Sequence, residues 1–81
     1  MGNNTAALAS LDRAMTIRKR IVEADPRNVR VVELLLGDYA RLADLQTSMG
    51  HPELANAALA DAETLKTKAD YRVPTSTGSR R

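Results

Sequence analysis

The stretch that decides the fold is residues 29–50, which read VRVVELLLGDYARLADLQTSMG. When this stretch is plotted as a helix at about 100° per residue, its apolar side chains cover an arc of about 200°. They are Val31, Val32, Leu34, Leu35, Leu36, Tyr39, Leu42, Ala43, Leu45 and Met49. An arc this wide predicts a helix over residues 29–49 that is buried on two sides, between two neighbouring helices.

Another helix is predicted before this stretch, over residues 5–24. Apolar residues recur there at helical spacing, and Asn4 or Thr5 can cap the first turn. The helix must end before Pro26, because proline lacks a backbone N–H and disfavours helical geometry in the residue that precedes it. Asn28 is then placed to cap the central helix.

A third helix is predicted over residues 52–69. Gly50 can adopt the left-handed conformation that closes the central helix, and Pro52 suits the first turn of the next one. The apolar residues of this helix form an ordinary one-sided face. They are Leu54, Ala55, Ala58, Leu59, Ala62, Leu65 and Ala69.

The composition also favours helices. The chain has 81 residues, with no Cys, Trp or Phe and only three Pro. Residues 71–81 have no hydrophobic periodicity and too little apolar surface to offset the entropy of ordering them. The predicted fold class is therefore all-α, with one antiparallel helical domain over residues 1–70 and a disordered tail over residues 71–81.

The sequence offers no catalytic machinery. Without cysteine there is no thiolate nucleophile and no Cys-ligated metal, and the single histidine, His51, sits in a predicted tight turn. Ser10, Thr16 and Ser48 have no general base at a recognisable spacing. We predict that the chain is not an enzyme and that it has no catalytic, cofactor-binding or metal site.

The charges do not point to nucleic acid or to a membrane. The net charge is +2, and residues 71–81 alone hold three arginines and no acidic residue. The one basic run, residues 18–20, projects around a helix and cannot form a flat phosphate-binding patch. A nucleic-acid binder using Arg13, residues 18–20 and the arginine tail is the weaker alternative. The longest apolar run, residues 34–36, is far shorter than the roughly 18 residues of a membrane span, so a cytoplasmic location is expected.

A small-large-small pattern occurs twice. Residues 7, 11 and 14 are Ala, Leu and Ala, and the same three residues recur 48 positions later, at 55, 59 and 62. Small side chains let two antiparallel helices approach closely. This pattern resembles the second helix of a tetratricopeptide repeat, and other positions agree with the resemblance. The residues that carry it are Ala7, Leu11, Ala14, Tyr39, Leu42, Ala43, Gly50, Ala55, Leu59 and Ala62.

The resemblance extends over about residues 5–69 and implies one and a half repeats with elongated helices. Two signature positions depart from the family, since Ala43 replaces its usual Gly and Gln46 its usual Tyr. Long repeats of this kind, with a dipeptide like Asp25-Pro26 between units, are similar to arrays that follow bacterial serine/threonine kinase domains. If the parent protein is such a membrane-anchored kinase, the segment could lie on either side of the membrane.

In the tetratricopeptide family the first helix of each hairpin lines a concave surface that holds a peptide. The resemblance therefore implies a protein–protein interaction module, acting as a scaffold or adaptor, with a protein or peptide as ligand. The binding stripe carried over by position is Glu33, Gly37, Ala40, Asp44, Thr47 and Ser48. Its two acidic residues suggest a ligand with basic groups, whereas a plain solvated helix face is the alternative interpretation.

The first predicted helix lacks its usual partner. Apolar surface around Ala7, Leu11, Ala14 and Ile21 is therefore expected to need a cover, either from upstream repeats or from a second copy in a homodimer. A freestanding three-helix bundle acting as a small dimeric adaptor is the main alternative. Arg18 and Asp38 both fall within apolar arcs, so an ion pair between them is expected to play a structural role.

Overall fold

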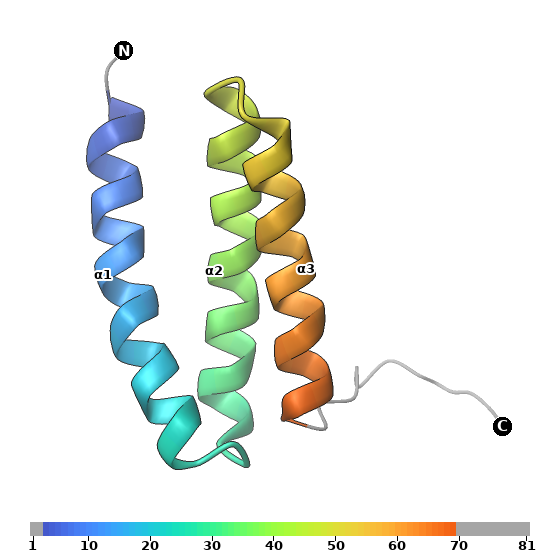
Figure 1. Cartoon of the computed structure of the whole chain (residues 1–81). Coiled ribbons are helices and arrows are strands. Elements are labelled where there is room, and N and C mark those ends of the chain that lie inside the picture. The colour runs from blue at the N-terminus through green and yellow to red at the C-terminus, as the bar shows by residue number, and fades with distance from the viewer. Residues whose placement is uncertain (1–2, 70–81) are drawn as a thin grey trace, which may run out of the picture.

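The computed structural model describes residues 3–69 of the chain. It contains three α-helices, α1 (Asn3–Ala24), α2 (Val29–Ser48) and α3 (Pro52–Lys68). Consecutive helices run antiparallel, and α2 lies between α1 and α3 (Figure 1). The prediction of an all-α fold with three antiparallel helices is thus confirmed. The helix ends differ from the predicted bounds by at most two residues, and the predicted tail over residues 71–81 lies outside the described residues.

The turn between α1 and α2 is built by its polar residues. Asp25 Oδ1 accepts a hydrogen bond from the Arg27 amide at 3.2 Å, and Asn28 Oδ1 accepts one from the Val31 amide at 3.2 Å. The second bond satisfies one of the free N–H groups at the start of α2, as expected for a capping asparagine. Asn28 therefore fixes the residue at which α2 begins.

The turn between α2 and α3 depends on one glycine. Gly50 has φ +82°, in the left-handed region, and the following amide of His51 donates to the carbonyl of Gln46 at 2.8 Å. This geometry closes α2 in the manner expected of a C-terminal glycine. Pro52 then opens α3, at a position where its missing N–H leaves no bond unmade.

The core consists of one side of α1, a wide arc of α2 and one side of α3. Its most deeply buried side chains are Val32 and Leu35, each 1% exposed. α3 contributes mainly small residues, namely Ala55, Ala58 and Ala62, together with Leu65. The alanines let α3 approach α2 closely, because there is no bulky side chain to hold the two backbones apart.

The three helices form an open layer. Both α1 and α3 pack against α2, but in the described part of the chain no Cα atom of α1 lies within 8 Å of one in α3. α2 is therefore the only helix with two neighbours, as its wide apolar arc predicts. None of the described helices combines the length and the apolar character that crossing a membrane requires.

Candidate functional site

The predicted binding stripe lies on the exposed side of α2. All six residues of the stripe, Glu33, Gly37, Ala40, Asp44, Thr47 and Ser48, are exposed. A Cβ atom added at Gly37 would meet nothing within 4 Å, so this part of the surface is open. Thr47 donates its hydroxyl hydrogen bond to the carbonyl of Ala43 at 2.9 Å and so belongs to the helix itself. The stripe thus offers a helix face of small residues with two carboxylates, and Arg30 and Arg41 are exposed along one side of it.

The repeat-signature residues divide into buried and exposed sets. Most are buried or half-buried, and Gly50 makes its turn. The buried and half-buried ones are Leu11, Ala14, Tyr39, Leu42, Ala43, Ala55 and Ala62. Leu59 differs from expectation, because it is 49% exposed, whereas Ala7 is exposed in line with its predicted place on the uncovered surface of the first helix. Leu11 and Leu59 occupy the same place in the sequence pattern but opposite environments, so the two matching segments do not pack equivalently.

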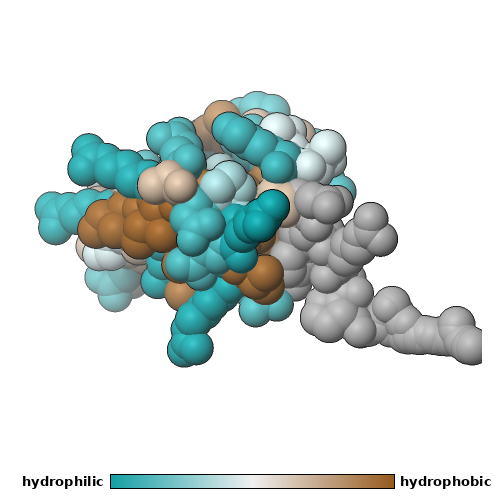
Figure 2. All heavy atoms as spheres, turned by 90° about the horizontal axis from the view of Figure 1, so that it is seen from below, coloured by the Kyte–Doolittle hydropathy of each residue, from teal (hydrophilic) through white to brown (hydrophobic). Residues whose placement is uncertain are grey.

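The uncovered apolar edge of α1 differs in part from the prediction. Leu11 is only 6% exposed because α2 covers it, which corrects the expectation that it would lack a cover. Ile21 is 39% exposed, as expected, and Ile17, which the sequence analysis did not single out, is 59% exposed. Figure 2 shows hydrophobic surface on the side of the molecule that α1 occupies. The apolar edge of α1 is thus formed by Ile17 and Ile21.

The predicted pairing between Arg18 and Asp38 is present. Arg18 Nη1 donates to Asp38 Oδ2 at 2.5 Å, joining α1 to α2. The Asp38 side chain is 5% exposed, whereas that of Arg18 is 31% exposed and reaches toward water. A buried carboxylate needs such a partner, so the pair is a structural link between the two helices.

A groove runs between α1 and α3, with α2 as its floor. It has a volume of about 190 Å³, below the roughly 300 Å³ at which pockets for drug-sized ligands begin. Its lining is Lys19, Val22, Glu23, Leu35, Tyr39, Asp61, Thr64, Leu65 and Lys68. Such a groove can admit side chains of a partner.

Tyr39 lies on the floor of this groove. The Lys19 ammonium nitrogen lies 5.8 Å from the centre of the Tyr39 ring, within the range of a cation–π interaction. Burial raises the pKa of the Tyr39 hydroxyl, and the negative charge of Asp61 raises it further. Sequence analysis missed this grouping, since nothing in the spacing of residues 19, 39 and 61 predicts that they meet.

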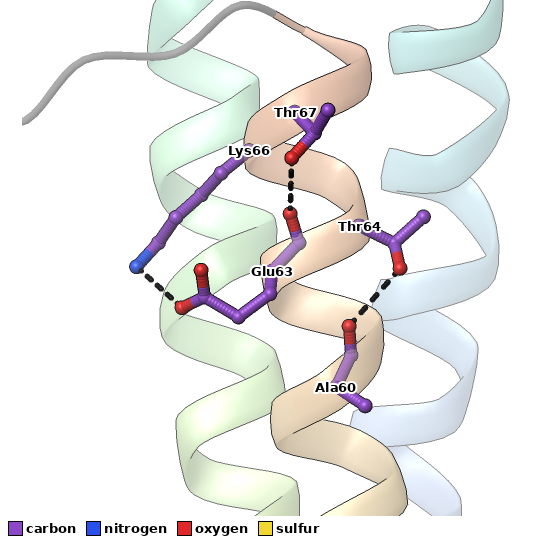
Figure 3. A network of polar contacts seen from close by, with 5 residues as sticks. All are labelled: Ala60, Glu63, Thr64, Lys66 and Thr67. Atoms are coloured by element: carbon purple, nitrogen blue, oxygen red, sulfur yellow. Dashed lines mark hydrogen bonds and ion pairs between the residues drawn. The ribbon is translucent and has the colours of Figure 1, made fainter.

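Other polar contacts join residues close together in the sequence. On α3, the Glu63 carboxylate pairs with the Lys66 ammonium at 3.1 Å, while the hydroxyls of Thr64 and Thr67 donate to backbone carbonyls one turn back (Figure 3). His51 Nδ1 lies 3.9 Å from Glu53 Oε2, and both side chains are well exposed. An exposed imidazole with one exposed carboxylate lacks the enclosed second group that acid–base catalysis requires.

Comparisons with protein-family models, with curated proteins and with solved structures find no match for this chain.

Within residues 3–69 there is no group of three or more His, Cys, Asp or Glu residues placed to hold a metal ion. Three surfaces of the described residues carry the functional argument below: the acidic stripe of α2, the apolar edge of α1, and the groove between α1 and α3.

Proposed function

We propose that this chain is a protein–protein interaction module, a tetratricopeptide-like scaffold or adaptor segment of one and a half repeats. The observation that carries the proposal is the open layer, in which α1 and α3 both pack on α2 and not on each other. A layer of this kind leaves both of its faces available to partners, as helical repeat arrays do.

The stripe of α2 is the proposed peptide-binding face. Gly37 and Ala40 leave room for a ligand to approach the helix backbone, and Asp44 provides an exposed carboxylate beside them. The carboxylates of the stripe favour a peptide that carries Lys or Arg, through both the rate of encounter and the choice of partner. The ligand class is therefore a basic protein segment.

The edge of α1 is the proposed point at which the layer continues. Ile17 and Ile21 present apolar surface that another helix could cover, either from an upstream repeat or from a second copy of the chain. The alternative of a closed three-helix bundle has less support, because a closed bundle requires α1 and α3 to pack together. A dimeric adaptor would use the same edge.

The test of the stripe compares two exposed helical alanines. A library of basic and acidic peptides is screened against the full chain and against the variants Ala40→Arg on the stripe and Ala60→Arg on α3, both of which are exposed. Basic peptides should bind the unchanged chain and Ala60→Arg alike, and bind Ala40→Arg at least about tenfold more weakly. Equal binding to the two variants would refute the stripe as the binding face.

A further inference from the structure

The groove between α1 and α3 lies on the other side of the layer from the acidic stripe. Tyr39 lines the groove, whereas the stripe residues Gly37 and Asp44 are about 150° away around α2. The two surfaces therefore cannot be occupied by the same short ligand. A ligand of the groove would be independent of the peptide proposed for the stripe.

The groove has buried apolar side chains from all three helices in its lining. Leu35 is 1% exposed, Val22 is 5% exposed, and Leu65 and Tyr39 are each 7% exposed, so these side chains are held by the core beneath them. Among the described residues the Tyr39 hydroxyl forms no hydrogen bond. A buried ring with a hydroxyl that lacks a protein partner is a group that a ligand could satisfy.

The walls of the groove carry charges in opposite order. Lys19 of α1 and Asp61 of α3 both lie near Tyr39, and Glu23 and Lys68 stand at the last turns of the same two helices. Each wall therefore has one positive and one negative side chain, and the two walls carry them in opposite order along the groove. Within residues 3–69 none of these four side chains forms an ion pair.

We propose that this groove docks an amphipathic helix of a partner protein. The helix would insert a narrow apolar stripe over Leu35 and Tyr39. On its side facing α1, the helix would carry an acidic residue toward Lys19 and a basic residue toward Glu23. On its side facing α3, it would carry a basic residue toward Asp61 and an acidic residue toward Lys68. The docked helix would complete a four-helix arrangement around the Tyr39 ring.

A helix fits this groove better than the other occupants. An extended peptide would bring unpaired backbone groups against helices whose own backbone bonds are already made, whereas a helix satisfies its backbone internally. Nucleic acid is disfavoured because both walls carry an acid. The α1 edge of a second copy is flanked by Arg13 and Arg20, which would place a base and not an acid opposite Lys19.

The test uses two synthetic helical peptides of about 18 residues, long enough to form a helix in solution. Both have one leucine stripe with two Glu and two Lys beside it. The matched probe has the charge order described above. In the control probe each of these two Glu is replaced by Lys, and each of the two Lys by Glu. Because the matched order is unchanged when the helix is turned end for end, the control mismatches in either direction of binding.

Binding is measured by NMR titration of the isotope-labelled full chain. The matched probe should bind about tenfold more tightly than the control and shift the amides around Tyr39. In the variant Lys19→Glu/Glu23→Lys/Asp61→Lys/Lys68→Glu, whose four sites are all exposed, the preference should reverse. If that variant does not fold, Lys19→Glu/Asp61→Lys should abolish the preference.

Three outcomes would overturn the proposal. They are equal binding of the two probes, binding of neither probe, and a preference that the charge exchange leaves unchanged. Occupation of the groove by residues 70–81, or by a second copy, would also overturn it. Occupation by residues 70–81 would appear as shifts of the amides of residues 70–81 when the four-site variant is compared with the unchanged chain, without any peptide. Occupation by a second copy would appear as a lower solution mass of that variant than of the unchanged chain. The stripe variant Ala40→Arg should leave probe binding intact, so the two proposals can fail separately.

Discussion

Arg18 of α1 and Asp38 of α2 form an ion pair in which only the arginine reaches solvent. The two residues are unequal partners, because a buried carboxylate that loses its cation stays buried, whereas a guanidinium on a long side chain can turn to water. The pair joins α1 to α2, which is the only described helix that packs against α1. The link is therefore most sensitive to removal of the arginine.

The first prediction concerns this asymmetry. Arg18→Met should lower the free energy of unfolding by about 3 kcal/mol, because it leaves the Asp38 carboxylate buried without its partner. Asp38→Leu should cost about 1 kcal/mol or less, and the double variant Arg18→Met/Asp38→Leu should regain most of the loss. Urea denaturation of the full chain measures all three. Equal losses in the two single variants would contradict the assignment.

The second prediction concerns the two glycines of the described chain. Gly50→Ala should destabilise the fold by about 1 kcal/mol, because a side chain is strained at φ +82°. Gly37→Ala should instead stabilise it by about 0.5–1 kcal/mol, since Gly37 lies within α2 and an added Cβ meets nothing. Thermal melting of the two variants should show shifts of opposite sign. A shift of the same sign would refute this reading of the turn.

The third prediction concerns pH. The pKa of Tyr39 is raised above its ordinary value of 10.0, chiefly by burial. The folded chain therefore holds this proton when the unfolded chain has released it. The resulting stability is fully present below pH 10.0 and is lost as the pH rises through the folded-state pKa.

The free energy of unfolding should accordingly fall more steeply above pH 10.0 in the unchanged chain than in Tyr39→Phe. Lysine residues titrate in the same range, so the difference between the two proteins is the informative quantity. Parallel stability curves for the two proteins would show that Tyr39 ionises as freely in the fold as in the unfolded chain.

The fourth prediction concerns the apolar edge of α1. If Ile17 and Ile21 are a contact surface, the full chain should associate with itself as its concentration rises. The variant Ile17→Ser/Ile21→Ser should reduce this association, while the stability of the monomer changes by about 0.5 kcal/mol or less per site. Light scattering measures the mass. Leu59→Ser, which alters an equally exposed leucine on α3, is the control and should have no effect.

The sequence was sufficient to predict the elements and their order. The helix ends follow from local signals, namely the cap at Asn28, the turn at Gly50 and the prolines at 26 and 52. The central position of α2 followed from the width of its apolar arc, and the Arg18–Asp38 pair from two charges placed inside apolar arcs. Each of these signals acts within one helix or between two adjacent helices.

Which side of α1 and which side of α3 packs against α2 could not be predicted in the same way. α1 buries Leu11, Met15 and Val22, whereas α3 buries four residues that include three alanines. A shared small-large-small pattern does not say which side of it meets α2, so Leu59 was wrongly placed on the packed face and Leu11 on the uncovered one. The groove was missed because its charges come from helices that touch only α2, and its geometry depends on how those helices are spaced.

The central claim is that α1 is held from one side only and so offers an incomplete edge to a partner. Amide hydrogen exchange of the full chain tests this most directly, because it reports the opening of each helix separately. The account predicts that the protected amides of α1 exchange at least about tenfold faster than those of α2 around Leu35. If all three helices exchange together, at the rate of global unfolding, the chain is a closed cooperative bundle and the interaction-module account is contradicted.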